Sequence, residues 1–152
     1  GYSIISNGGY EITPTLLKKK KLPRQRILNE NLSETINPIL RKIVSTKEGT
    51  AGFADVKGYE IGGKTGTADQ PSKGGYSKKK VNTFASVFPT TDPKFVLAVM
   101  LDEPKANKEF VYHYRDDRYP YKGNWRNTAG WTTVWVTGQI MDKIGPILAT
   151  KY

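Results

Sequence analysis

Apolar residues return at helical spacing between residues 33 and 46 and predict a helix with one buried face. The positions of this face are Ile36, Ile39, Leu40, Ile43 and Val44. Ser33 is a suitable N-cap. Pro38 conflicts with so early a start, and Asn37 as the cap would place Pro38 at the first helical position, where proline is tolerated. The helix is expected to stop near Gly49.

A second, longer helix is predicted for residues 128–144. Its wide apolar face consists of Trp131, Val134, Trp135, Gly138, Ile140, Met141 and Ile144. Gly138 would allow the helix to lie close to a sheet, because glycine has no Cβ atom. We expect the tryptophans to pack in the core and the helix to end at Gly145 and Pro146.

The start of the chain reads as the last turns of a helix that ends at Gly8 and Gly9. A domain seldom begins there, so we expect a longer parent protein that includes an upstream portion and any membrane anchor. Residues 10–17 could add a brief strand. The longest apolar run, residues 95–101, is far shorter than the roughly 20 residues that a membrane-spanning helix requires.

Three strands are predicted in the middle of the chain. The first covers residues 56–67, and the second, at residues 81–88, is rich in β-branched and aromatic residues. Residues 94–102 are almost wholly apolar and are expected to form a central strand. The short turn at residues 89–93 suits an antiparallel pair, and a polar loop is expected at residues 69–80. The predicted fold class is α+β: one antiparallel sheet of three or more strands packed against helices.

The chain is basic, with a formal net charge of +10 over 152 residues. Much of the charge lies in two lysine runs, residues 18–21 and 78–80, which either favour a polyanionic partner or are solvated loop charges. The sequence has no cysteine, which excludes a disulfide framework and a cysteine-based metal site. Its single histidine, His113, excludes a multi-histidine metal site.

An irregular stretch at residues 103–126 interleaves tyrosines with basic residues. The tyrosines and the basic residues are Tyr112, Tyr114, Tyr119 and Tyr121, with Arg115, Arg118 and Lys122. Such a stretch could stack on bases or sugars. More often its tyrosines fold back on the domain, and the pattern leaves both interpretations open.

The stretch with the most informative chemistry is residues 62–68, Gly-Gly-Lys-Thr-Gly-Thr-Ala. Glycine lets a backbone run close to another molecule, because no Cβ stands in the way. Lys64 offers an ammonium group, and Thr65 and Thr67 offer hydroxyl donors. The stretch is therefore predicted to bind a carboxylate or a phosphate along a strand.

Two interpretations of this stretch are weak. Residues 58–65 satisfy the phosphate-loop pattern G-x-x-x-x-G-K-[ST], but no buried parallel strand precedes them, and Gly66 and Pro71 preclude a helix after Thr65. A nucleic-acid module is supported by charge alone, because the aromatics lack the strand pattern of single-strand RNA readers. A non-catalytic basic domain that binds an anionic polymer or nucleic acid remains the alternative hypothesis.

The third interpretation is the Lys-Thr-Gly element of the serine acyltransferases that act on penicillin and on D-alanyl-D-alanine peptides. That chemistry needs a nucleophilic serine in Ser-x-x-Lys, a second serine, and a strand bearing Lys-Thr-Gly. Matching blocks occur in order at residues 5–9, 14–17, 48–51, 58–68, 85–89, 92–93, 99–104 and 128–131. Through them the chain resembles the C-terminal part of a class B penicillin-binding protein, a peptidoglycan D,D-transpeptidase of the cell-division type, with features of alphaproteobacterial members.

The resemblance implies a role for each residue of the motif. Lys64 would supply positive charge and help hold the proton network of the nucleophile and the second serine. Thr65 and Thr67 would donate hydroxyls to the carboxylate of the terminal D-alanine or of a β-lactam, and Gly66 would let the ligand lie along the strand. The backbone N–H of Thr67 would be one of two oxyanion donors, which typically contribute about 10²–10³ in rate each. No metal and no organic cofactor are implied.

The chain departs from the family pattern in its serines. It contains no Ser-x-Asn, and its Ser-x-x-Lys match, Ser77 to Lys80, follows the motif instead of preceding it, so we interpret that match as chance. The chain alone is therefore expected to lack the nucleophile and to be inactive. In the family the upstream part supplies a helical subdomain and further strands, so this chain is expected to expose apolar sheet surface and to self-associate.

The resemblance also implies the setting of the parent protein. Residues 1–152 would form the C-terminal portion of a transpeptidase domain held at the periplasmic face of the bacterial inner membrane. The parent would cross-link stem peptides by serine acyl transfer. Its partners would be a stem peptide ending in D-Ala-D-Ala, β-lactam antibiotics, and membrane proteins of cell division or elongation, with no nucleic acid.

Overall fold

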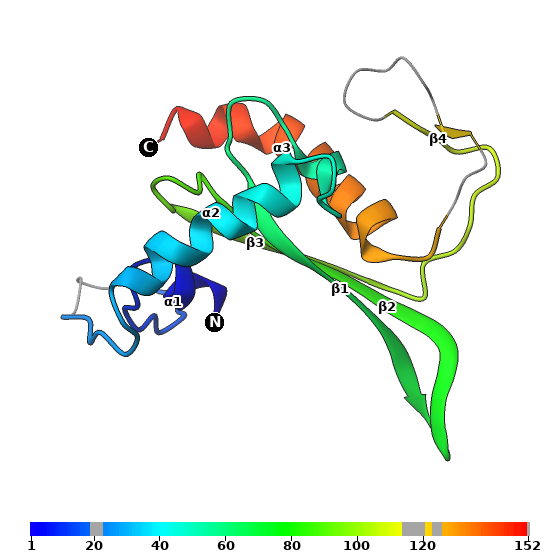
Figure 1. Cartoon of the computed structure of the whole chain (residues 1–152), viewed down its shortest axis with the longest axis horizontal. Helices are drawn as coiled ribbons and strands as arrows, with labels where there is room; N and C mark the ends of the chain where they lie inside the picture. Colours follow the sequence, from blue (N-terminus) through cyan, green and yellow to red (C-terminus); the bar gives the residue numbers. More distant parts are fainter. Residues whose placement is uncertain (19–22, 114–120, 123–125, 152) are drawn as a thin grey trace.

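The chain forms a three-stranded sheet with helices on both of its faces (Figure 1). The computed structural model describes residues 1–18, 23–113, 121–122 and 126–151, with the side chains of residues 121–122 left out. In order the elements are α1 (Tyr2–Ser6), α2 (Asn31–Ser45), η1 (Gly52–Ala54), β1 (Gly62–Ser72), β2 (Gly75–Phe88), β3 (Phe95–Asp102), β4 (Val111–Tyr112), β5 (Tyr121–Lys122), η2 (Ala129–Trp131) and α3 (Thr133–Ala149). The predicted α+β class is confirmed.

The three long strands lie in the order β1-β2-β3, and both pairs are antiparallel. Lys64 on β1 lies opposite Ala85 on β2, which lies opposite Ala98 on β3. Side chains alternate between the faces of a sheet, so these three share one face. Thr65 and its partner Phe84 belong to the other face.

The main core lies between the sheet and α3. Phe84 is fully buried in a cluster that includes Val134 and Met141 of α3. Gly138 brings α3 close to η1 and not to the sheet as predicted, because a Cβ atom there would lie 2.3 Å from the carbonyl oxygen of Phe53. On the opposite face α2 crosses the start of β1 and α1 contacts β2 and β3.

Helix α1 ends as predicted, with the two glycines that follow it in the left-handed region. Helix α2 begins at Asn31, two residues earlier than predicted, and Pro38 lies inside it. Ser33 is not its N-cap: the Ser33 hydroxyl bonds to α1 instead, donating to the Ile5 carbonyl and accepting from the Gly8 N–H. The hydrogen bonds of Ser33 to α1 thus stabilise the first turn of α2, which the sequence pattern had placed outside the helix.

Helix α3 also differs from its predicted limits. It begins at Thr133, after the short helix η2, and it continues through Gly145 and Pro146 to Ala149. The ring of Tyr59 packs against Gly145, where a Cβ atom would lie 2.4 Å from its Cζ. Gly145 therefore serves close packing and does not terminate the helix. None of the described helices is long and apolar enough to cross a membrane.

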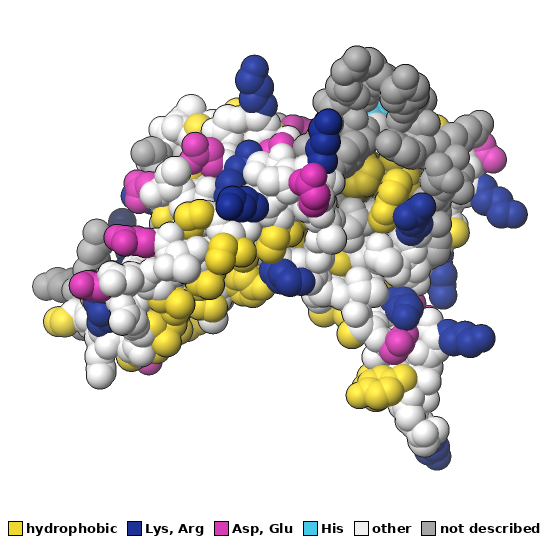
Figure 2. All heavy atoms as spheres, in the orientation of Figure 1, with side chains coloured by type: hydrophobic (Ala, Val, Ile, Leu, Met, Phe, Trp, Pro, Cys, Tyr) yellow, Lys and Arg dark blue, Asp and Glu magenta, His cyan; other side chains and the backbone are white. Residues whose placement is uncertain are grey.

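Strand β3 is an edge strand among the described residues, which corrects the prediction that it is central. Its exposure alternates along the strand. Val96 and Met100, on the face of Lys64, are 42% and 68% exposed, whereas Leu97 on the other face packs against the core. Figure 2 shows hydrophobic side chains in a band beside α2, over α1 and the adjoining part of the sheet.

The predicted polar loop at residues 69–80 is wrong, because β1 and β2 continue through it as a hairpin (Figure 1). Ser72 pairs with Gly75 across a two-residue turn, and Gly74 has φ +85°. Glycine at such a φ is typical of tight hairpin turns. The glycines there thus mark a turn and not a flexible loop.

Two further expectations concern the irregular segments. The predicted strand at residues 10–17 reduces to a single bridge between Tyr10 and Arg26. Tyr112 is buried and folds back on the domain, where its ring contacts Phe53 and Trp131. The other tyrosines and the basic residues named for this stretch, and most of the first lysine run, lie outside the described residues or side chains.

Candidate functional site

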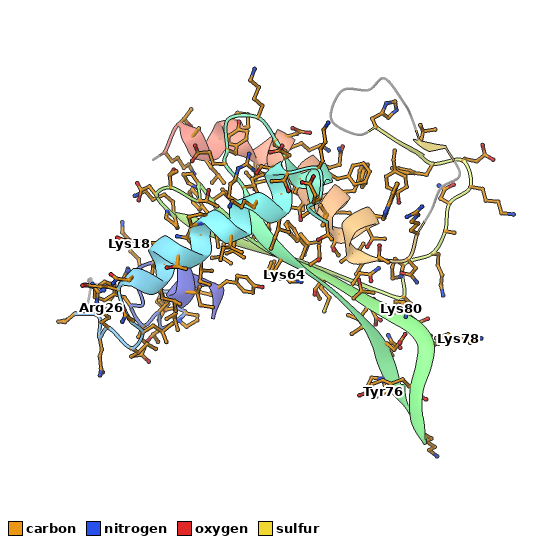
Figure 3. The ribbon with its side chains drawn as sticks, viewed as in Figure 1. Lys18, Arg26, Lys64, Tyr76, Lys78 and Lys80 are labelled. Atoms are coloured by element: carbon orange, nitrogen blue, oxygen red, sulfur yellow. The ribbon has the colours of Figure 1, made fainter. Side chains whose placement is uncertain are left out.

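The Lys-Thr-Gly segment lies on β1, the strand at one edge of the sheet. Lys64 is exposed, and its ammonium donates to the backbone carbonyl of Thr65 at 2.8 Å. Among the residues that the structure describes, no carboxylate forms an ion pair with Lys64. Its charge is therefore not neutralised and remains available to an anion on this edge. Figure 3 shows Lys64 near the middle of the molecule, well apart from the labelled lysines of the hairpin.

The backbone of Thr65 and Thr67 points to the open edge. In an antiparallel pair, alternate residues direct their N–H and C=O toward the partner strand. The Gly66 carbonyl points to β2, where it accepts the Thr83 hydroxyl at 3.4 Å, while the Thr65 carbonyl accepts the Lys64 ammonium. The N–H groups of Thr65 and Thr67 are thus placed to bond an extended ligand added alongside β1.

The two threonine hydroxyls are held by other segments of the chain. The Thr65 and Thr50 hydroxyls lie 3.1 Å apart and share a hydrogen bond. The Thr67 hydroxyl oxygen accepts the Ala129 N–H at 2.9 Å, and a hydroxyl that accepts a bond can still donate its own proton. The structure therefore brings together three blocks that are far apart in the sequence, residues 48–51, 64–67 and 128–131.

The packing of β1 against β2 requires a glycine at position 66, and the sequence did not reveal this requirement. A Cβ atom on Gly66 would lie 2.5 Å from the Thr83 hydroxyl of β2. The glycine thus makes room for its neighbouring strand. The predicted role, to let a ligand lie along β1, is a separate matter and stays a prediction.

Arg41 of α2 anchors the start of β1, and sequence analysis missed it. One guanidinium nitrogen donates to the Ile61 carbonyl and another to Asp55, both at 2.8 Å. Helix α2 also contacts Gly62 directly, where a Cβ atom would lie 2.9 Å from the Arg41 nitrogen. The position of the strand that bears Lys-Thr-Gly is therefore set by α2.

Asn82 of β2 is the second residue that sequence analysis missed. It is fully buried, and its amide nitrogen donates to Asn127 at 2.9 Å and to the Thr132 hydroxyl at 3.0 Å. These bonds fix the segment that leads into α3, which includes Ala129. An asparagine within the apolar-rich part of a strand was the available signal, because a buried polar side chain needs partners.

The Ser-x-x-Lys match lies in the hairpin and lacks the geometry of a nucleophile pair. Ser77 and Lys80 are three residues apart on β2, so their side chains point to opposite faces. The Lys80 ammonium pairs with Asp69 at 2.5 Å. The phosphate-loop interpretation fails as well, because Thr65 is followed by strand and not by a helix.

Outside the motif, shifted pKa values occur at Lys79 and Glu103, beside the hairpin, and at Tyr112. Lys79 pairs with Glu103 at 2.7 Å; this bond raises the pKa of Lys79 and lowers the pKa of Glu103. Burial raises the pKa of Tyr112. Within the described ranges, no three His, Asp or Glu side chains gather as a set that could hold a metal ion.

The chain matches a known family over most of its length. The model of the penicillin-binding protein transpeptidase domain matches residues 1–118. The probable peptidoglycan D,D-transpeptidase FtsI of Caulobacter vibrioides is 32% identical over 160 residues, which cover 95% of this chain and 24% of that protein. The stage V sporulation protein D of Bacillus subtilis is 34% identical over 97 residues. These matches give no support to the alternative of a non-catalytic basic domain.

Solved structures share the fold. The transpeptidase domain of penicillin-binding protein 3 from Burkholderia pseudomallei has a TM-score of 0.72 at 24% identity and covers 96% of this chain. Penicillin-binding protein 3 of Mycobacterium tuberculosis, in complex with aztreonam, has a TM-score of 0.64. The chain spans 40% and 34% of these solved chains, and about a quarter of the Caulobacter protein. The chain belongs to the penicillin-binding protein transpeptidase family.

Proposed function

We propose that residues 1–152 form one side of the active site of a peptidoglycan D,D-transpeptidase, the side that binds the peptide carboxylate. The observation that carries this proposal is the open edge of β1. There the Lys64 ammonium forms no ion pair within the described residues and bonds the outward-facing Thr65 carbonyl, and Thr65 and Thr67 of the same strand add two hydroxyls. An ammonium and two hydroxyl donors suit a carboxylate. The named activities of the relatives make the peptide carboxylate the preferred anion.

Each residue of the motif takes a role in acyl transfer. Thr65 and Thr67 donate their hydroxyl protons to the carboxylate of the terminal D-alanine, and Lys64 supplies the opposite charge. The Thr67 N–H donates to the carbonyl oxygen of the scissile amide as it becomes an oxyanion. Lys64 and Thr67 therefore act on the reacting groups, while Thr65 and Gly66 shape the binding edge.

The serine that attacks the scissile carbonyl comes from a part of the parent outside these residues. Its attack forms an acyl-enzyme ester and releases D-alanine, whose amine takes a proton. An amine of a neighbouring stem peptide then attacks the ester, restores the serine and completes the cross-link. A β-lactam enters the same site because its carboxylate and strained amide carbonyl occupy the same positions.

The parent works at the periplasmic face of the inner membrane, together with membrane proteins of division or elongation. This setting is supported by the names of two relatives, a peptidoglycan D,D-transpeptidase and a sporulation protein. The chain shown here is inactive alone, because its Ser-x-x-Lys match is not a nucleophile pair.

Intact mass spectrometry after incubation with a β-lactam tests the proposal. The chain of residues 1–152 and a version extended upstream through a Ser-x-x-Lys are compared. We expect one adduct on the extended version only. A stoichiometric adduct on the short chain would contradict the claim that it lacks the nucleophile, and an adduct on neither would contradict the transpeptidase assignment.

A further inference from the structure

Thr50 is an exposed threonine in the turn between α2 and η1, and it reaches the edge of β1. Its hydroxyl oxygen lies 3.1 Å from that of Thr65, and either oxygen can be the donor in this hydrogen bond. Thr65 is one of the two threonines that bind the ligand carboxylate in the proposed function. The direction of the bond between Thr50 and Thr65 therefore decides what Thr65 can offer to a ligand.

The backbone around Thr50 is held in place by its neighbours. Ala51 is fully buried, and its N–H donates to the Ile43 carbonyl of α2 at 3.0 Å. Gly49 packs so tightly against the same carbonyl that a Cβ atom there would collide with the oxygen. On the other side, a Cβ atom on Gly130 would lie 2.6 Å from the Thr50 carbonyl oxygen. The Thr50 side chain is thus carried to the edge of β1 by a backbone that has little room to move.

The number of available protons fixes the direction of this bond when an anion is bound. A threonine hydroxyl has one proton and two lone pairs, whereas an ionised carboxylate can only accept. When Thr65 gives its proton to the carboxylate, it has none left for Thr50. Thr50 must then donate to the Thr65 oxygen, and the two hydroxyls form a chain that ends on the ligand. Successive hydrogen bonds in such a chain polarise and strengthen one another.

Thr67 receives a similar bond from a different segment. Its hydroxyl oxygen accepts the Ala129 N–H at 2.9 Å, and a backbone N–H can only donate. Each threonine of the motif therefore has a neighbour outside β1 that can donate to its oxygen, the Ala129 N–H for Thr67 and the Thr50 hydroxyl for Thr65. The two donors differ in one respect, because Thr50 takes this role only when Thr65 donates to a ligand.

We propose that Thr50 is a positioning residue for the carboxylate site: its hydroxyl donates to Thr65 and thereby directs the Thr65 proton to the ligand. The inference rests on the proposed function, because Thr50 acts through the bond between Thr65 and the carboxylate. It adds a residue from outside the Lys-Thr-Gly strand to the binding of the ligand. It also gives the bond between residues 48–51 and β1 a purpose beyond the fold.

Acylation of the full-length parent by a fluorescent β-lactam tests the proposal. Thr50→Val keeps the branched shape of the side chain and removes the hydroxyl. We expect its second-order rate constant of acylation to fall about 2- to 10-fold, the value of one net hydrogen bond. Thr50→Ser keeps the hydroxyl and should recover most of the loss. Thr150→Val, at an exposed threonine directly after α3, is the matched control and should acylate at the parent rate.

A double-mutant cycle separates a role through Thr65 from a general disturbance of the fold. Thr65→Val should acylate more slowly than the parent. Adding Thr50→Val to Thr65→Val should cause no further loss, because Thr50 then has no hydroxyl to orient. A further loss as large as that of Thr50→Val alone would show two independent effects and would overturn the proposal.

The outcomes also separate the role of Thr50 from the proposed function. Thr50→Val at the parent rate, together with a slow Thr65→Val, would overturn the role of Thr50 alone. A loss in Thr50→Val that Thr50→Ser does not reverse would overturn it too, since the hydroxyl would not be the cause. Thr65→Val at the parent rate, or a parent that is not acylated at all, would overturn the proposed carboxylate site and the role of Thr50 with it.

Discussion

The bond between Thr67 and Ala129 ties the proposed binding edge to the stability of the fold. The change Thr67→Val keeps the shape of the side chain and removes the oxygen that accepts the Ala129 N–H at 2.9 Å. Ala129 is 1% exposed, so water cannot replace the lost acceptor. An unpaired buried donor costs about 1–3 kcal/mol, and the free energy of unfolding should fall by this amount.

Thr65→Val is the matched control on the same strand. Its hydroxyl pairs with that of Thr50, which is exposed, so water can satisfy the group left behind. The free energy of unfolding should change by no more than about 0.5 kcal/mol, as for other surface substitutions. The higher strand preference of valine is the same in both variants and cancels.

Urea unfolding followed by circular dichroism measures the difference. We expect the midpoint of Thr67→Val to lie clearly below that of Thr65→Val, and Thr67→Ser, which keeps the oxygen, to recover most of the loss. Equal midpoints for the two valine variants would refute the inference that Thr67 anchors the segment before α3.

Three further predictions concern other parts of the chain. Arg41→Met should lower the free energy of unfolding by about 1.5–3 kcal/mol, because the Ile61 carbonyl and Asp55 lose charge-assisted bonds; a urea midpoint equal to that of the parent would contradict this. Burial raises the pKa of Tyr112 above its usual 10.0. The contribution of this shift to stability is therefore full below pH 10 and is lost as the pH rises further. Tyr112→Phe should reduce this alkaline loss of stability when urea midpoints are measured across that pH range. The chain should self-associate in light scattering through the exposed face of β3, and Met100→Lys should return it to monomers while Tyr76→Lys does not.

The sequence placed the Lys-Thr-Gly stretch on a strand, as the structure has it, and the chemistry expected of that stretch stays a prediction. Residues 62–68 could be assigned to a strand that binds an anion because ammonium, hydroxyl and glycine occur together within a few residues. The order of residues 48–51 and 128–131 along the chain contributed to the family resemblance, but their convergence on that strand was not predicted. The bonds from Thr50 and Ala129 give that order a physical cause.

The residues that were missed act over long distances in the sequence. Arg41 bonds a carbonyl 20 residues away, and Asn82 bonds a hydroxyl 50 residues away. Local periodicity carries no information on such pairs. The same reason explains the early start of α2, where Ser33 contributes to packing against α1 and not to capping.

The errors in the strands have a different origin. Strand β3 is apolar on both faces, and this pattern predicts a central strand when no neighbour is known. Here one face meets α3, and the other carries the exposed Val96 and Met100. The hairpin was predicted as a loop because lysines and glycines are depleted in strands. The backbone pairing of β1 with β2, which continues to the pair Ser72–Gly75, nevertheless holds it extended.

The central claim is that the β1 edge binds the carboxylate of the acylating ligand. The most direct test is the second-order rate constant of acylation of the full-length parent by a fluorescent β-lactam, compared between Lys64→Ala and the hairpin control Lys78→Ala. Loss of one charge-assisted bond to the carboxylate should slow Lys64→Ala by about 10- to 100-fold, while Lys78→Ala should acylate at the parent rate. Equal rates for Lys64→Ala and the parent would contradict the account.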